Sequence, residues 1–269
     1  MSKKTNPAFT LSQEELFVVL AYLKVEALVG LDDQILKSLS PEQIQLVMSV
    51  AERALISREF LSPGADNRLQ LEKVVLAIVG ACAAAETTLV VTHNRPNRPT
   101  ENLFFHTARK MVVMHSMPVT AIHQFVALEE KSDIAKLVTA ILDVKEQSVL
   151  KCPEGQIQDE LITQARDAAL ESGKAKALEV LAKSKLEQNT ADQFAATLTS
   201  LVSNTTQVYI KHQKNGDSAA DGFTILQGSN GAWILKPIEN DKTAEKYVSL
   251  KPTSPKEISE KIRSLISAS

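Results

Sequence analysis

Four histidines are the side chains whose type and grouping first suggest chemistry. They are His93, His106, His115 and His123. Imidazole nitrogens are common zinc ligands, and a structural zinc site needs four ligands in a tetrahedral arrangement. The sequence holds no H-E-x-x-H, and neither cysteine belongs to a C-x-x-C pair that could complete such a site. A zinc site therefore depends on whether the fold brings these histidines together.

The spacing of the histidines argues against a shared site. His106 and His115 lie an odd number of residues apart on one expected strand, 103–115, so their side chains should point to opposite faces. If a turn at residues 116–118 sets the register, His123 would face the neighbourhood of Met111, not His115 or His106. We therefore expect partly exposed histidines on a sheet, with neither a metal nor a cofactor.

No pattern for phosphate binding or nucleophilic catalysis is present. The glycines form neither G-x-G-x-x-G nor a Walker loop, and G-x-S-x-G is absent. Gly228 and Gly231 lie between two expected strands and indicate a hairpin. Acidic pairs such as Asp32 and Asp33 are adjacent in sequence, so their side chains diverge on a helix or strand. We expect a protein that is not an enzyme.

The strongest basic feature is the proline-stiffened segment 93–99, His-Asn-Arg-Pro-Asn-Arg-Pro. Rigid exposed loops often carry function, so Arg95, Arg98 and His93 are the candidate partner-binding residues. The same segment could be the wing of a winged-helix DNA-binding regulator, with 42–60 as the recognition helix. That helix carries three glutamates against two arginines, which makes nucleic acid the less favoured partner.

Composition indicates a globular protein of the cytoplasm. Of 269 residues, 44% are hydrophobic, and the formal net charge of -2 provides no field that would attract polyanions. Cys82 and Cys152 cannot build a disulfide framework, so we interpret them as thiols in a reducing compartment. The longest apolar run, 74–85, is too short to cross a bilayer, and no signal-peptide pattern occurs near the N-terminus, so we expect no membrane association.

Helices come first in the chain, and strands follow. Ser12 with Glu15 is a capping-box pattern that opens a helix ending at Gly30, and Ser40-Pro41 opens a second helix that runs to about Leu61. A third buried helix is expected over 71–85, although its valines also fit a strand. Strands are then expected at 88–92, 103–115 and 119–128, and Ser132 caps a short helix.

The pattern begins again after a linker at about 145–155. Helices are expected over 157–182, with a break at Gly173, and over 191–202. Strands and a final capped helix follow, at 208–210, 223–226, 232–235, 247–250 and from Ser254.

The repeated order of elements predicts a duplicated α+β fold. A strand and a capped helix at 125–141 resemble those at 247–265. We expect two similar halves, each with helices followed by an antiparallel sheet and a closing helix, possibly related by a pseudo-two-fold axis. The halves are 11–150 and 151–269, preceded by a flexible N-terminal segment, 1–10.

The sequence resembles the EspG family of cytosolic chaperones in type VII (ESX) secretion. The resemblance lies in the order of elements and in three stretches: Leu11-Ser12-x-x-Glu15-Leu16, the helix end at 51–61, and the closing hairpin, strand and Ser254-Pro255 helix. Glu59 stands where the family usually has glycine. The resemblance implies a non-enzymatic protein of the cytoplasm that binds another protein, a helical secretion substrate.

Overall fold

The computed structural model describes residues 6–109, 111–144, 150–200, 204–214, 217–238 and 246–267. The chain forms two compact units. Unit 1 comprises Met1–Val90, Glu101–Asp133 and Lys211–Ala219, and unit 2 comprises Val91–Thr100, Ile134–Ile210 and Ala220–Ser269. The predicted halves, 11–150 and 151–269, are defined by the order of elements rather than by compactness, so they and their pseudo-two-fold relation stay a prediction.

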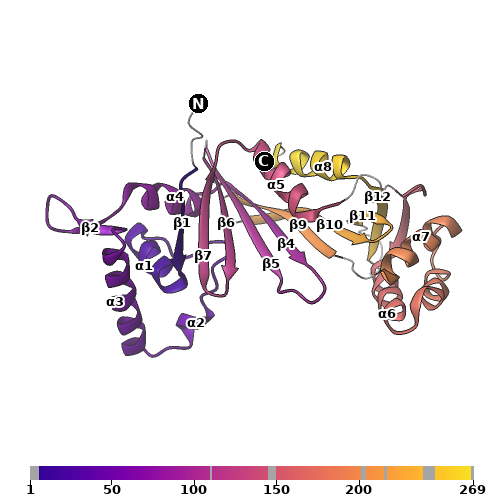
Figure 1. Ribbon diagram of the computed structural model, residues 1–269, viewed down its shortest axis with the longest axis horizontal. Helices are drawn as coiled ribbons and strands as arrows, with labels where there is room; N and C mark the ends of the chain where they lie inside the picture. The colour runs from indigo at the N-terminus through magenta and orange to yellow at the C-terminus, as the bar shows by residue number, and fades with distance from the viewer. Residues whose placement is uncertain are drawn as a thin grey trace. The chain divides into compact units, whose positions relative to one another are not determined.

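Unit 1 contains helices packed on one face of a sheet whose strand order is β1-β7-β6-β5-β4 (Figure 1). Its helices are α1 (Gln13–Leu23), α2 (Gln34–Lys37), α3 (Pro41–Ser57) and α4 (Lys73–Ala83). Its strands are β1 (Ala8–Ser12), β5 (Glu101–Ala108), β6 (Met111–Val119), β7 (Ile122–Leu128) and the start of β4 (Thr87–Asn94). A small separate sheet pairs β2 (Leu61–Pro63) with β3 (Leu69–Leu71).

Unit 2 contains most of the strands that follow in the same sheet, in the order β9-β10-β11-β12-β8. Its strands are β8 (Gly155–Gln158), β9 (Asn204–Lys214), β10 (Asp217–Gly228), β11 (Gly231–Ile238) and β12 (Tyr247–Thr253). Its helices are α5 (Ser132–Leu142), α6 (Asp159–Leu181), α7 (Gln188–Thr199) and α8 (Pro255–Ser267). The core centres on Trp233, whose indole N–H donates to Thr197 Oγ1 at 2.8 Å and whose ring meets Phe194 edge-on. The predicted α+β class, with antiparallel sheets and helices, is confirmed.

Local signals in the sequence located the helix starts well. Ser12 and Ser40 both form complete capping boxes at the N-termini of α1 and α3, and 71–85 contains a helix, α4. The break at Gly173 and the hairpin that pairs Gly228 with Gly231 are confirmed. The end of the first helix was predicted too late. Helix α1 stops at Leu23 rather than near Gly30, because Lys24, which is not a glycine, adopts the left-handed conformation that ends it.

Two short strands lie where none was expected from the sequence. Strand β1 begins at Ala8, inside the segment expected to be flexible, because Phe9 and Leu11 pack into the core of unit 1. Strand β8 covers Ile157, which was expected to be helical. Residues 145–149 of the linker expected at about 145–155 lie outside the described residues.

Strand β5 and strand β6 replace the single strand expected over 103–115. The chain reverses at Arg109, which has φ 50°, and no Gly, Pro or Asn marks this turn in the sequence. The turn expected at residues 116–118 lies inside β6, and the chain reverses again at Ala121, with φ 60°. Both corrections change which side chains share a face of the sheet.

Alanine substitutions at Gly30 and Gly80 should change the free energy of unfolding in opposite directions. Gly30 has φ +92°, and an added Cβ would lie 2.6 Å from the Phe104 ring, whereas an added Cβ at Gly80, in α4, meets nothing within 4 Å. We expect Gly30→Ala to lower the free energy of unfolding by about 2 kcal/mol, through backbone strain and overpacking. Gly80→Ala should raise it by about 0.5–1 kcal/mol, because alanine favours a helix interior. Urea unfolding followed by circular dichroism measures both, and equal effects would contradict this account.

Candidate functional site

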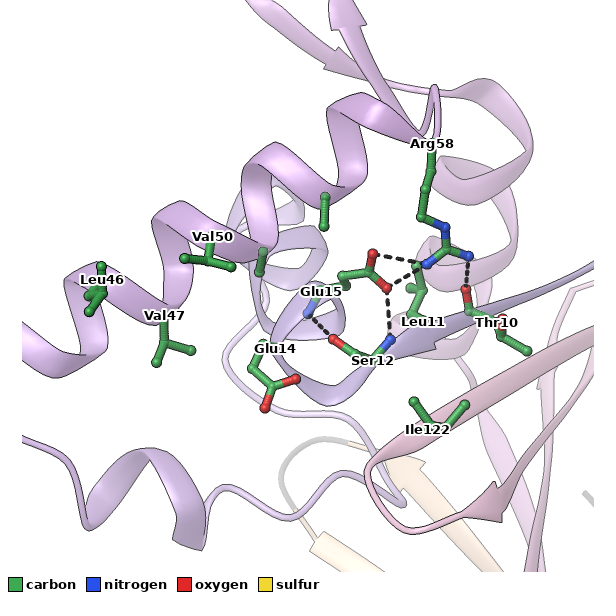
Figure 2. A pocket seen from close by; sticks show the side chains of 12 residues that line it. Thr10, Leu11, Ser12, Glu14, Glu15, Leu46, Val47, Val50, Arg58 and Ile122 are labelled. Carbon is green, nitrogen blue, oxygen red and sulfur yellow. Dashed lines mark hydrogen bonds and ion pairs between the residues drawn. The ribbon is translucent and has the colours of Figure 1, made fainter.

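An open groove of about 590 Å³ lies in unit 1 between α3 and the junction of β1 with α1 (Figure 2). We call it the α3 groove. Its apolar lining comprises Leu11, Leu46, Val47, Val50, Ala51, Ala54 and Ile122. Its polar lining comprises Thr10, Ser12, Glu14, Glu15 and Arg58. The groove therefore has an apolar wall on the helix and polar groups at one end.

Helix α3 carries more apolar surface than its packing uses. Ala51 and Leu55 are buried against the core of unit 1. Leu46 and Val50, one helical turn apart on the groove side, are 64% and 50% exposed. Large apolar side chains grouped on an exposed surface commonly mark a site of protein contact. The amphipathic pattern predicted the helix. The structure shows in addition that the apolar stripe of Leu46 and Val50 is exposed.

The polar end of the groove is organised around the buried carboxylate of Glu15. The backbone N–H of Ser12 donates to Glu15 Oε2 at 2.8 Å, and the N–H of Glu15 donates to Ser12 Oγ at 3.1 Å. The Arg58 guanidinium donates through Nη1 to both carboxylate oxygens, at 2.6 Å and 2.9 Å, and lies over the Phe60 ring. This ion pair joins the end of α3 to the start of α1.

The same ion pair closes the free edge of β1. Strand β1 is the edge strand of its sheet. Gln13 N–H donates to Ala121 O and Ala127 N–H donates to Pro7 O, so the backbone groups at the odd-numbered positions of this segment point toward β7. By alternation, the backbone groups of Thr10 and Ser12 point outward. Thr10 O accepts from Arg58 Nη2 at 2.7 Å, and Ser12 N–H is taken by Glu15. Addition of a further strand at this position is therefore unfavourable.

The predicted partner-binding residues belong to unit 2, whereas the α3 groove belongs to unit 1. His93 is buried, with Nδ1 2.7 Å from Thr206 Oγ1. Arg95 is half-buried, Arg98 is exposed, and the N–H of Arg98 donates to Arg95 O at 3.2 Å. The role of these three residues stays a prediction. The α3 groove was missed because its two walls are more than thirty residues apart in sequence.

Three of the four clustered histidines form a continuous row inside unit 1, which corrects the expectation that they face apart. We call His106, His115 and His123 the histidine row. His106 Nε2 lies 3.4 Å from His115 Nδ1, and His115 Nε2 lies 2.8 Å from His123 Nδ1. Their pairing partners place all three on one face of β5, β6 and β7. The parity argument failed because the turn at Arg109 was not recognised.

The histidine row is buried, and its burial disfavours the charged form of each ring. All three side chains are at most 1% exposed, and Thr88 Oγ1 lies 3.1 Å from His106 Nδ1 at one end. Burial lowers the pKa of His106 to about 4 and holds the pKa of His115 well below its ordinary value of 6.5. Burial also lowers the pKa of His123, partly offset by the nearby Glu14 carboxylate. Within the described residues no group of three or more side chains is arranged to hold a metal ion.

Comparison with known proteins places this chain in a family. The family model described as "Uncharacterised protein YfjC" matches residues 8–256. The chain belongs to the YfjC family. A search of curated proteins finds no significant match to this YfjC-family chain. No helix in the described part of the YfjC-family chain is long and apolar enough to span a membrane.

The YfjC-family fold is similar to a solved secretion chaperone. That structure is the type VII secretion system chaperone EspG5 of Mycobacterium tuberculosis in complex with a PE25-PPE41 dimer. The likeness has a TM-score of 0.66 and covers 97% of this chain and 96% of the other, at 14% sequence identity. It confirms the EspG-like fold expected from the sequence.

Removal of the Arg58 guanidinium tests the ion pair. Arg58→Met keeps the aliphatic stem but leaves the buried Glu15 carboxylate without its cation, so the free energy of unfolding should fall by about 2 kcal/mol. Arg53→Met, at an exposed position of the same helix, should change it by less than about 0.5 kcal/mol. Urea denaturation at pH 7.5 compares the two, and equal losses would show that the pair contributes nothing specific.

The buried row predicts a loss of stability in mild acid. The folded-state pKa values lie below 6.5, so this contribution is fully present above pH 6.5 and is lost as pH falls toward the folded values, near 4 for His106. Each such histidine contributes a slope of at most about 1.4 kcal/mol per pH unit. Urea midpoints between pH 7.5 and 5 should therefore fall, and His106→Gln should flatten the dependence by about one proton. His212→Gln, at a half-exposed position, is the control. An unchanged slope in His106→Gln would contradict the prediction.

Proposed function

We propose that this YfjC-family chain is a non-catalytic, chaperone-like protein of the cytoplasm that binds a helical segment of another protein in the α3 groove. The observation that carries the proposal is the exposed apolar stripe of Leu46 and Val50 beside a strand edge whose backbone groups are already bonded. The fold likeness supports it, because the similar chaperone was solved in complex with a protein dimer.

The closed edge of β1 favours a helix over a strand as the occupant. An extended peptide binds a sheet edge through main-chain hydrogen bonds, and Arg58 and Glu15 occupy the groups it would need at Thr10 and Ser12. A helix satisfies its own backbone and binds through side chains, with apolar residues at i and i+4 that match Leu46 and Val50. The half-buried Glu14 carboxylate at the groove suits a lysine or arginine beside that apolar stripe.

We also propose that the 93–99 loop of unit 2 contacts a protein partner. Arg98 is exposed and Arg95 half-buried, so they would supply polar contacts at the rim of an interface, while His93 would support the loop from beneath. Winged-helix DNA binding receives no added support, because Arg58, one of two arginines in the expected recognition helix, is paired with Glu15.

The non-catalytic part of the proposal rests on the side chains that line the groove. The Glu15 carboxylate is committed to Arg58, and the Ser12 hydroxyl caps α1. A reaction would need an activated nucleophile or a free acid–base pair, and within the described lining only Glu14 remains as an ionisable group outside that network.

Capture of the client and a matched pair of substitutions test the proposal. Tagged full-length chain is recovered from its native cell after cross-linking, and the bound protein is identified by mass spectrometry and purified. Leu46→Glu and Val50→Glu should each weaken its affinity at least about 10-fold, because a charge replaces apolar contact. Leu170→Glu, at a 62% exposed leucine of α6, should leave it unchanged.

The outcomes separate the alternatives. Equal affinity of Leu46→Glu and the unsubstituted chain would place the client elsewhere, and a loss specific to Leu170→Glu would point to α6. Recovery of duplex DNA with steep salt dependence, abolished by Arg95→Glu with Arg98→Glu, would support the DNA-binding alternative instead.

A further inference from the structure

The histidine row spans three strands beneath the segment that connects α1 to α2. Its imidazole rings lie 5.6 Å and 5.1 Å apart, centroid to centroid, and His115 also stacks on Phe125 at 4.6 Å. The backbone of Val29 interacts with His115, and Gly30 lies against Phe104. The row is thus covered by the 24–33 segment, which a hydrogen bond from Gln13 Nε2 to Asp32 O ties to the start of α1.

The hydrogen bonds of the row limit how many protons it can hold. A neutral imidazole has one N–H and one bare nitrogen, so each contact between rings works only with one proton between its two nitrogens. Three neutral rings place two protons in the contacts and the third at one end, either on His106 Nδ1 or on His123 Nε2. One tautomer is therefore shared by all three rings.

One extra proton fits this arrangement, and a second does not. With one extra proton both ends of the row are protonated and both contacts stay intact. Thr88 Oγ1 is the neighbour at the His106 end, and His123 Nε2 has no hydrogen-bond partner among the described residues. A further proton either sets N–H against N–H at one contact or turns a His115 N–H from its neighbouring ring to the Val29 backbone, and in both cases that contact between rings is lost. Opening is therefore coupled to more than one proton.

The charged surroundings of the row are one-sided. On the α1 side the Glu14 carboxylate acts on His123, whereas on the β4 side the neighbour is the uncharged Thr88 hydroxyl. In the covering segment, Asp32 directs its carboxylate to Gln34 N–H at 2.9 Å, and Glu26 is exposed. The first extra proton is accordingly favoured at His123, beside Glu14.

We propose that the histidine row is a proton-sensitive latch that holds the α3 groove in its binding shape and opens when a second extra proton enters. This proposal concerns regulation of the groove and so rests on the proposed function. The row is connected directly to the groove, because His123 pairs with Leu11 of β1 and its chain neighbour Ile122 pairs with Ser12. Leu11, Ser12, Glu14 and Ile122 all line the groove.

Backbone exchange and ring-nitrogen spectra on the full-length chain test the latch without any client. Hydrogen exchange, corrected for its intrinsic pH dependence, is followed between pH 7.5 and 5. As the pH falls toward the opening midpoint, exchange at 8–12, 24–33 and 122–125 should rise by roughly 100-fold per pH unit, as two linked protons require, against 10-fold for one. Segments 223–235 and 247–253 of unit 2 should keep their protection. Ring-¹⁵N spectra at pH 7.5 should show one tautomer in all three histidines.

Glu14→Gln tests the direction of the effect. Loss of the carboxylate beside His123 should shift the opening to higher pH, because Glu14 favours the singly protonated row that stays closed. Glu26→Gln, in the exposed part of the covering segment, should leave the opening pH unchanged. Both substitutions are at positions outside the core, so folding of the variants is checked by their exchange at pH 7.5.

Independent one-proton titrations of the three histidines, mixed tautomers, or protection that stays constant to pH 5 would each overturn the latch. These outcomes leave client binding at Leu46 untouched. Conversely, if Leu46→Glu binds the client as tightly as the unsubstituted chain, the proposed function of the groove fails but the exchange measurements stay valid. The two proposals can therefore fail separately.

Discussion

The Arg58–Glu15 ion pair is the interaction on which the arrangement of unit 1 depends. It satisfies a buried carboxylate that already caps α1 through Ser12, and it fastens the end of α3 beside β1. Because Arg58 also bonds Thr10 O, the pair closes the edge of the sheet. A single arginine thus joins the end of α3 to β1, neutralises the carboxylate of a helix cap and removes a site for strand addition.

That constraint underlies our proposal that the α3 groove binds a helix. With the main-chain groups of β1 engaged, the groove offers the apolar face of α3 and the Glu14 carboxylate to an occupant. These are side-chain features, and they match an amphipathic helix with a basic residue better than an extended peptide. The histidine row lies behind the same strand, so its protonation acts on the groove floor through the Leu11–His123 pair.

Much of the fold followed from local sequence, and the site did not. Ser12 with Glu15 and Ser40 with Pro41 predicted two helix starts because a cap involves residues only three apart. The turn at Arg109 has no glycine, proline or asparagine, so one missed reversal inverted the faces assigned to His106 and His115. Arg58 meets Glu15 across 43 residues, and no periodicity links them. The uncovered stripe on α3 became visible only once the packing of Ala51 and Leu55 was known.

The central claim is our proposal that a partner protein lies against the exposed apolar face of α3. Site-specific photo-cross-linking in the native cell tests it most directly, with a benzophenone amino acid placed at Val50 and, in a separate chain, at Leu170. We expect a cross-linked client from position 50, with the adduct mapped to an apolar helix face of that client. Adducts formed only from position 170, or none from position 50 in a chain that still captures its client, would contradict it.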